Sequence, residues 1–218
     1  MLAAASLRES FTAIGEQLEE RSPGLSVRFS FAASSEVAQQ VLAGAPADVI
    51  ATASPEPLQP VLDAGAATDP AVVARNRLQV AVPAHDPAGV ASLADLARPE
   101  VAVALCQPQV PCGALARRVL AEAGVAVTPV TEEPDVRAAL TKVVLGEVDA
   151  ALVYATDVRA AGDDVRGVEV PAGLDATTAY PVALVPDGPS PEGGRAFVDA
   201  VLSPEGQQVL ADAGFAPP

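Results

Sequence analysis

Short apolar runs alternate with amphipathic stretches along the whole chain. In the first amphipathic stretch, apolar residues recur at helical spacing at Leu7, Phe11, Ile14 and Leu18, and Pro23-Gly24 ends the pattern. Continuous apolar runs, such as Ala150 to Tyr154, are typical of strands buried on both faces. The alternation predicts an α/β fold in which mainly parallel sheets are flanked by helices.

The same periodicity places the individual elements. Helices are predicted at Leu7–Arg21, Ser35–Ala43, Pro55–Ala64, Cys112–Ala123, Pro134–Leu145, Pro191–Leu202 and Pro204–Ala213, with a short one near Ser92–Leu96. Strands are predicted at Ala3–Ala5, Val27–Phe31, Asp48–Ala53, Leu78–Val82, Val101–Leu105, Ala150–Tyr154, Val165–Val170 and Ala179–Val185. A Ser-Pro pair, which suits an N-cap and a first turn, opens each of the last two helices.

The chain of 218 residues has room for one large α/β domain or for two small lobes that share a hinge. No Gly/Ser-rich linker is present, so two domains on a flexible string are not expected. We instead predict that the chain crosses twice between two lobes. Lobe 1 comprises residues 1–77 and 182–218, lobe 2 comprises 78–181, and the hinge lies near 76–78 and 180–182.

Charge narrows the range of partners. The formal net charge is −15, which repels a nucleic-acid backbone or an anionic membrane surface. A small anion is also opposed at long range, so any anion site must depend on local hydrogen-bond donors. No uncharged apolar run is long enough to span a bilayer, and residues 1–5 resemble the end of a buried strand. We therefore expect a segment upstream of Met1, with or without an export signal.

Two cysteines lie in the turn-rich segment Cys106-Gln-Pro-Gln-Val-Pro-Cys112. Two interpretations remain open: a disulfide, if the protein is exported, or two small free cysteines in a packed loop. A zinc site is disfavoured, because no further Cys or His lies nearby and the single histidine, His85, is in a loop next to proline.

Several helices begin directly after a predicted strand, where α/β folds place ligands. Ser6 follows the first strand, and with Glu9 three residues later it fits a capping box. Ser34 stands in the same relation to the second helix. Pro111-Cys112-Gly113 and Pro134-Asp135-Val136 open two further helices, and Tyr154 ends a strand. For either serine taken alone, a simple cap is the more economical interpretation.

Taken together, these segments resemble the periplasmic molybdate-binding proteins of ABC transporters, which belong to the type II periplasmic-binding-protein family. The resemblance covers essentially the whole chain, and it lies in the order of many short motifs. The matching segments are 3–7, 29–35, 44–49, 76–78, 110–113, 135–137, 153–157, 180–182 and 214–215.

The resemblance implies two lobes that close over one molybdate or tungstate dianion, with no cofactor and no directly coordinated metal. Ser6 and Ser34 would donate hydroxyl and backbone N–H groups from one lobe. Cys112 and Val136 would donate backbone N–H groups from the other lobe, and Tyr154 its phenol. The family usually has Ala at position 112, so a disulfide to Cys106 would be a departure. The resemblance also implies a monomeric, extracytoplasmic receptor, free or lipid-anchored, that delivers its ligand to a membrane permease.

Other functions fit the residues less well. A serine hydrolase would need a base, and His85 is the only histidine, while neither serine lies in a Gly-x-Ser-x-Gly motif. The acidic pairs Glu132-Glu133 and Asp163-Asp164 are interpreted as solvated turns rather than catalytic carboxylates. A receptor of the same fold for sulfate or another small solute is the main alternative. A regulator with this fold would normally carry a DNA-binding segment, which this sequence lacks.

Overall fold

The computed structural model describes residues 1–218. The chain forms two compact units: residues Met1–Arg75 with Ala179–Pro218, and residues Asn76–Thr178. It therefore leaves the first unit after Arg75 and returns at Ala179. The lobe boundaries expected from the sequence, at 77 and 182, lie close to these two crossings. That the crossings act as a hinge stays a prediction.

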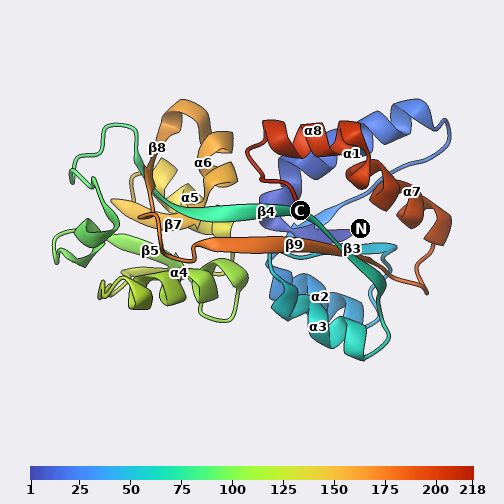
Figure 1. The fold of residues 1–218 in the computed structure, drawn as a ribbon, viewed down its shortest axis with the longest axis horizontal. Helices are drawn as coiled ribbons and strands as arrows, with labels where there is room; N and C mark the ends of the chain where they lie inside the picture. Colours follow the sequence, from blue (N-terminus) through green and yellow to red (C-terminus); the bar gives the residue numbers. More distant parts are fainter. The chain divides into compact units, whose positions relative to one another are not determined.

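Unit 1 contains a sheet with the strand order β2-β1-β3-β9. Its strands are β1 (Leu2–Ala4), β2 (Ser30–Ala32), β3 (Val49–Ala51) and β9 (Thr177–Leu184). β1 is parallel to both β2 and β3, whereas β9 is antiparallel to β3. In Figure 1, one face of this sheet is covered by α2 (Ser34–Leu42) and α3 (Pro55–Asp63). The other face carries α1 (Arg8–Arg21), α7 (Pro191–Leu202) and α8 (Pro204–Asp212).

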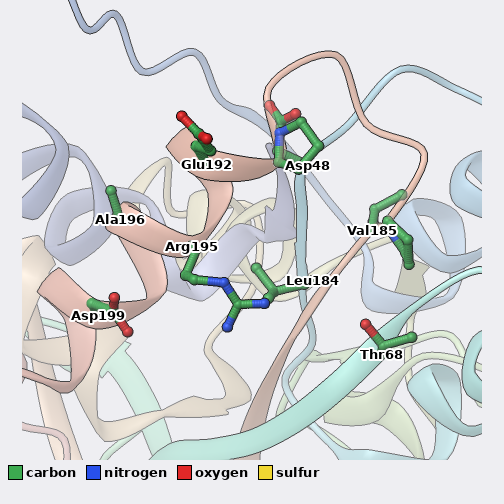
Figure 2. Close-up of a pocket in the computed structure, with 10 residues that line it drawn as sticks. Asp48, Thr68, Leu184, Val185, Glu192, Arg195, Ala196 and Asp199 are labelled. Carbon is green, nitrogen blue, oxygen red and sulfur yellow. The ribbon is translucent and has the colours of Figure 1, made fainter.

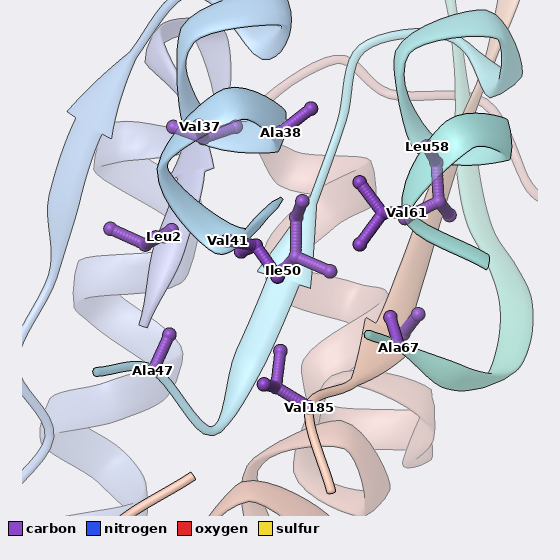
Figure 3. Packing of buried hydrophobic residues seen from close by; sticks show 11 residues of the cluster. Leu2, Val37, Ala38, Val41, Ala47, Ile50, Leu58, Val61, Ala67 and Val185 are labelled. Atoms are coloured by element: carbon purple, nitrogen blue, oxygen red, sulfur yellow. The ribbon is translucent and has the colours of Figure 1, made fainter. Parts of the chain in front are cut away.

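Apolar residues from both sides hold this sheet in place. Val37 of α2 and Val61 of α3 pack with Ile50 of β3 in a cluster that Figure 3 shows, and all three are completely buried. On the opposite face, the ring of Phe11 meets that of Phe197 edge to face at a centroid distance of 5.2 Å. Removal of these apolar surfaces from water, about 25 cal/mol per Å², supplies the driving force for the packing.

Unit 2 contains a sheet with the strand order β8-β4-β7-β5-β6. β4 (Thr68–Pro83) begins in unit 1 and continues into unit 2 from Asn76. The other strands are β5 (Val103–Cys106), β6 (Thr131–Glu133), β7 (Ala150–Tyr154) and β8 (Val165–Glu169). β5 is parallel to β6 and β7, and β4 is antiparallel to β7 and β8. α4 (Pro111–Glu122) covers one face, and α5 (Val136–Val144) and α6 (Ala155–Ala161) cover the other (Figure 1). Unit 2 also contains short 3-10 helices at Leu93–Ala97 and Gly162–Asp164, and unit 1 contains one at Ala5–Leu7.

The structure corrects several sequence predictions. β4 has 16 residues, far more than the predicted Leu78–Val82, because only part of the strand is continuously apolar. Glu132-Glu133 forms part of strand β6 rather than a turn, since β6 pairs with β5 and Arg117 forms an ion pair with Glu132. β2 begins three residues later than predicted, at Ser30. Helix α6 was not predicted, because it follows β7 with no intervening turn.

Helix capping also differs from the prediction. No side-chain cap is present at the start of α1 or of the 3-10 helix before it, so the Ser6–Glu9 capping box is wrong. Of the two Ser-Pro openings, Ser203 caps α8 by accepting from the Gly206 N–H at 3.1 Å, whereas Ser190 makes no side-chain cap for α7. These capping motifs therefore indicate correctly where a helix starts, but they do not determine what the serine hydroxyl contacts.

Candidate functional site

Ser6 and Ser34 leave unit 1's sheet at the same edge. In the parallel register of β1 and β2, Ala4 lies beside Ala32. Each serine comes two residues after its strand's last residue, and each begins or precedes a helix that runs back along the sheet. Both serines are almost completely buried, with 5% and 2% of their surface exposed. This is the strand end at which α/β sheets bind ligands.

Ser34 follows β2 and is held by the segment after β3, which lies on the other side of β1 in the sheet. Its Oγ accepts a hydrogen bond from the backbone N–H of Ala53 at 2.9 Å, and Ala53 follows β3 by two residues. A backbone N–H can only donate, so the single hydroxyl proton of Ser34 remains available for another acceptor. Ser34 is also the first residue of α2, whose N-cap Ala33 has no side chain that could use the helix's leading N–H groups.

Ser6 has a different partner. Its Oγ lies 2.8 Å from the hydroxyl oxygen of Tyr180, in a buried contact between residues 174 positions apart. Tyr180 is completely buried in β9. In the sequence, Tyr180 marks a chain crossing and lies in the family-like segment 180–182, but no role was assigned to its hydroxyl. Its aromatic ring beside a proline offered a packing signal but no indication of its hydroxyl partner.

In unit 2, the three remaining candidates follow three adjacent strands. Cys106, which ends β5, lies beside Glu133, which ends β6, and the Gln107 N–H donates to the Glu133 carbonyl at 2.8 Å. On the other side of β5, Ala104 lies beside Ala151 of β7, so that Tyr154 ends its strand at the same edge. The segments that carry Cys112, Val136 and Tyr154 thus emerge from one edge of this sheet.

Cys112 lies in the first turn of α4 and is joined to Cys106 by a disulfide. The structure contains no free cysteine. Gly113 completes the same turn, and a Cβ there would overlap the Gln107 carbonyl oxygen and lie 2.6 Å from that of Cys106. The Arg117 guanidinium also donates to the Cys106 carbonyl, at 2.9 Å. The start of α4 is therefore held tightly against the end of β5.

Val136 is the first residue of α5. Asp135 caps this helix, and its Oδ1 accepts from the N–H groups of Arg137 at 2.8 Å and Ala138 at 3.0 Å. The cap thus engages the second and third amides of the helix but not the first. Helix N-termini carry partial positive charge, so the Val136 N–H is a suitable donor to an anion.

Tyr154 is the last residue of β7, and its hydroxyl is buried. Its backbone N–H donates to Oδ2 of Asp157 at 3.1 Å, and the other carboxylate oxygen of Asp157 lies 3.9 Å from the Arg137 guanidinium. Asp157 is only 1% exposed, so this pair compensates a buried negative charge. Sequence reasoning missed Asp157, although an acidic residue three positions after a strand end is a common helix-start signal.

The chain crossing into unit 2 makes a buried contact beside Tyr154. Asn76, the first residue of the unit, donates from Nδ2 to Oγ1 of Thr156 at 2.8 Å, while its Oδ1 accepts from the Arg77 N–H at 2.9 Å. Both Asn76 and Thr156 are buried. The crossing is thereby attached to the start of α6, two residues from Tyr154.

The five predicted residues therefore fall into two sets. Ser6 and Ser34 lie at one sheet edge of unit 1, and Cys112, Val136 and Tyr154 lie at one sheet edge of unit 2. All the donors in these sets are hydroxyl or backbone N–H groups, without a Lys or Arg side chain among them. Such groups can hold an anion through hydrogen bonds alone, and they include no nucleophile paired with a general base.

Unit 1 also contains a cavity of about 490 Å³ that none of the five residues lines. It lies at the opposite end of β3 from Ala53, against α7, and three carboxylates line it, those of Asp48, Glu192 and Asp199. Figure 2 shows the Arg195 guanidinium reaching from α7 toward Leu184. That guanidinium lies 3.7 Å from the carboxylate of Asp69. Carboxylates in this excess repel an anion, so the lining of this cavity does not suit one.

No group of three or more His, Cys, Asp or Glu side chains is arranged to hold a metal ion. None of the helices has the length and apolar character required to cross a bilayer.

Comparisons with known proteins define the class. A family model described as bacterial extracellular solute-binding protein matches residues 1–216. The chain belongs to this family of solute-binding proteins. Its fold is that of the type II periplasmic binding proteins, as the solved structures also indicate. The periplasmic molybdate-binding protein of Azotobacter vinelandii superposes with a TM-score of 0.87 at 19% identity, over 100% of this chain and 98% of that one.

Within the family, the similarity extends to particular proteins. The molybdate-binding protein ModA of Mycobacterium tuberculosis is 39% identical over 219 residues, which cover 100% of this chain and 84% of the relative. The sulfate-binding protein SubI of the same species superposes with a TM-score of 0.85 at 21% identity, over 99% of this chain and 85% of that one. At that identity, the second likeness concerns the fold alone.

Proposed function

We propose that this protein is the receptor of an ABC importer for molybdate, and that it also accepts tungstate. Ser6 and Ser34 of unit 1, with Cys112, Val136 and Tyr154 of unit 2, would together donate hydrogen bonds to one tetrahedral dianion. The 39% identity to a molybdate-binding protein over the whole chain supports the choice of ligand. The convergence of the two sets of residues on one ligand is part of the proposal.

The observation that carries the proposal is the Ala53 N–H that donates to Ser34 Oγ. Because a backbone N–H can only donate, this bond leaves the proton of the buried hydroxyl available for a fully ionised oxyanion. Charge-assisted hydrogen bonds of this kind are about twice as strong as neutral ones, so a dianion can be held without a basic side chain. A ligand that keeps a proton at neutral pH, such as phosphate, would find no acceptor for it at the proposed donors.

Receptor function has implications for partners and location. The protein would act outside the cytoplasm, free or lipid-anchored, and would pass its ligand to the membrane permease of the transporter. We propose that it works as a monomer, with no cofactor and with no catalytic residue. Closure of the two units around the ligand would let the permease distinguish loaded from empty receptor.

Sulfate is the ligand to test against molybdate, because it has the same charge and shape and a smaller radius. Discrimination would then depend on the size of the site, since the donors suit both ions. A receptor for sulfate or another small solute is the alternative function, which the fold alone would also accommodate.

Calorimetric titration with molybdate, tungstate, sulfate and phosphate in turn tests the proposal. We expect one molybdate or one tungstate per chain, much weaker binding of sulfate and no binding of phosphate. Thermal unfolding with each ion provides a second measurement, because a ligand that binds only the folded state raises the melting temperature. Absence of both heat and stabilisation with molybdate and tungstate would refute the specific ligand, and tighter binding of sulfate would favour the alternative.

A further inference from the structure

The hydroxyl groups of Ser6 and Tyr180 lie 2.8 Å apart, and either oxygen could be the donor by geometry. A serine hydroxyl has one proton and two acceptor lone pairs. If Ser6 donates to Tyr180, its only proton is engaged inside unit 1. If Tyr180 donates to Ser6, the Ser6 proton is available for an acceptor beyond the pair. The direction of this one hydrogen bond therefore decides whether Ser6 can serve as a donor to an anion.

The phenol of Tyr180 is held firmly in place beside Ser6. The side chain is completely buried, and its ring meets that of Phe215 edge to face, with centroids 5.2 Å apart and planes at 78°. The next residue, Pro181, accepts from the Thr52 N–H at 3.0 Å, which attaches β9 to the end of β3. Tyr180 is thus placed by packing and by the sheet, and its position does not depend on Ser6.

Ser34 provides an internal comparison. There an obligate donor, the Ala53 N–H, occupies the serine oxygen and leaves the hydroxyl proton for an outside acceptor. Tyr180 stands in the same relation to Ser6, but as a hydroxyl it can donate or accept. Both buried serines at this edge of unit 1 therefore have one internal polar partner at the oxygen.

We propose that Tyr180 is a positioning residue that donates its phenolic proton to Ser6 Oγ and so commits Ser6 to donate to the bound oxyanion. This inference rests on the proposed function for its ligand, but the direction of the hydrogen bond is a property of the free protein. Donation from the phenol also polarises the Ser6 hydroxyl and strengthens the bond that it makes to an anion. A ligand oxygen that carries a proton would meet a second donor at Ser6 and would be rejected.

A double-mutant cycle measures this role. We expect Tyr180→Phe to weaken molybdate binding about tenfold, because the Ser6 hydroxyl loses its preferred orientation while the ring packing against Phe215 is kept. In the Ser6→Ala background, the same change should have little further effect, since no hydroxyl remains to be oriented. An equal loss of affinity in both backgrounds would mean that Tyr180 acts only through packing, and would overturn the proposal.

A spectroscopic measurement tests the direction without reference to any ligand. The chain has two tyrosines and no tryptophan, so Tyr180 is the sole tyrosine of the Tyr154→Phe variant. Ultraviolet resonance Raman spectra distinguish a tyrosine that donates a hydrogen bond from one that accepts. We expect a donor spectrum in the free variant, and a change when Ser6→Ala is added. An acceptor spectrum would overturn the proposal. If molybdate does not bind the unaltered protein, the proposed function fails, while this spectrum still decides the direction of the Ser6–Tyr180 hydrogen bond.

Discussion

Ser34 and Ala53 come from segments that follow two different strands, and they meet through a single buried hydrogen bond of 2.9 Å from the Ala53 N–H to the Ser34 hydroxyl oxygen. The contact attaches the start of α2 to the segment after β3. It also leaves the Ser34 hydroxyl proton available for another acceptor. The same atom therefore contributes to folding and to the proposed binding, and the two contributions can be separated by experiment.

Ser34→Ala should weaken molybdate binding by about 1 to 3 kcal/mol, the usual cost of losing a donor to a charged group. It should also lower the free energy of unfolding, because the buried Ala53 N–H loses its acceptor. Calorimetry and urea unfolding measure the two effects. Ser203→Ala is the matched control: Ser203 accepts from a backbone N–H in the same way at the start of α8. This control should lose stability and bind molybdate normally. Normal affinity in the Ser34 variant would show that the site is misplaced.

Tyr154→Phe removes one hydroxyl from unit 2 and leaves the ring that ends β7. We expect molybdate affinity to fall by about 1 to 3 kcal/mol, as for Ser34, since the phenol is proposed as a direct donor. Thr141→Ala is a suitable control, because its exposed hydroxyl donates only to the Arg137 carbonyl within α5. Calorimetric titration of both variants with molybdate shows whether the Tyr154 hydroxyl contributes to binding. A phenylalanine variant that binds as tightly as the unaltered protein would exclude Tyr154 from the site.

The disulfide between Cys106 and Cys112 closes a short loop with a sequence separation of 6. In the chain-entropy model, such a loop contributes about 2 kcal/mol to the free energy of unfolding. Reduction, or replacement of both cysteines by Ala, should lower stability by that amount in urea unfolding. The double-alanine variant should then be insensitive to reductant, which separates loss of the cross-link from any general effect of the reducing agent. Equal stability of the oxidised and reduced protein would contradict this expectation.

Gly113 and Gly193 each occupy the third position of a helix that begins with proline, and they differ in what surrounds them. A Cβ at Gly113 would overlap the fixed carbonyl oxygen of Gln107, whereas at Gly193 it would meet the Ser190 hydroxyl, which can rotate. Gly113→Ala should therefore destabilise the fold by about 1 to 3 kcal/mol and weaken molybdate binding. Gly193→Ala should be nearly neutral. Similar melting temperatures for the two variants would contradict the steric argument.

Asp95 gives one pH-dependent contribution to stability. The Ser92 hydroxyl and the backbone N–H groups of Ala91 and Ser92 donate to its carboxylate, and they lower the pKa of Asp95 below its ordinary value. Its folded-state pKa is thus depressed, so the stabilisation is present above the unfolded-state pKa and is lost as the pH falls through the folded-state pKa. Ser92→Ala should raise the pKa of Asp95, whereas Ser92→Thr, which keeps the hydroxyl, should not. Titration by carbon-detected NMR measures both, and an unchanged pKa in the alanine variant would refute the assigned cause.

Much of the secondary structure followed from local patterns. The helix at Pro191–Leu202 and the strand at Ala150–Tyr154 have the predicted limits, because a Ser-Pro opening marks the helix and a short apolar run marks the strand. Such signals depend on a few neighbouring residues. Where a strand continues into polar sequence, as at the start of β4, the limit depends on pairing with other strands and was not predictable.

For the candidate site, the sequence determined which residues stand at strand ends and helix starts, since those positions follow from local order along the chain. Only the tertiary structure decided the partners of their polar atoms: Tyr180 for Ser6, Ala53 for Ser34, and Cys106 for Cys112. The physical reason is that a hydroxyl or thiol takes whichever partner the folded chain places within reach. For Ser6 that partner lies 174 residues away, a separation over which no local pattern carries information.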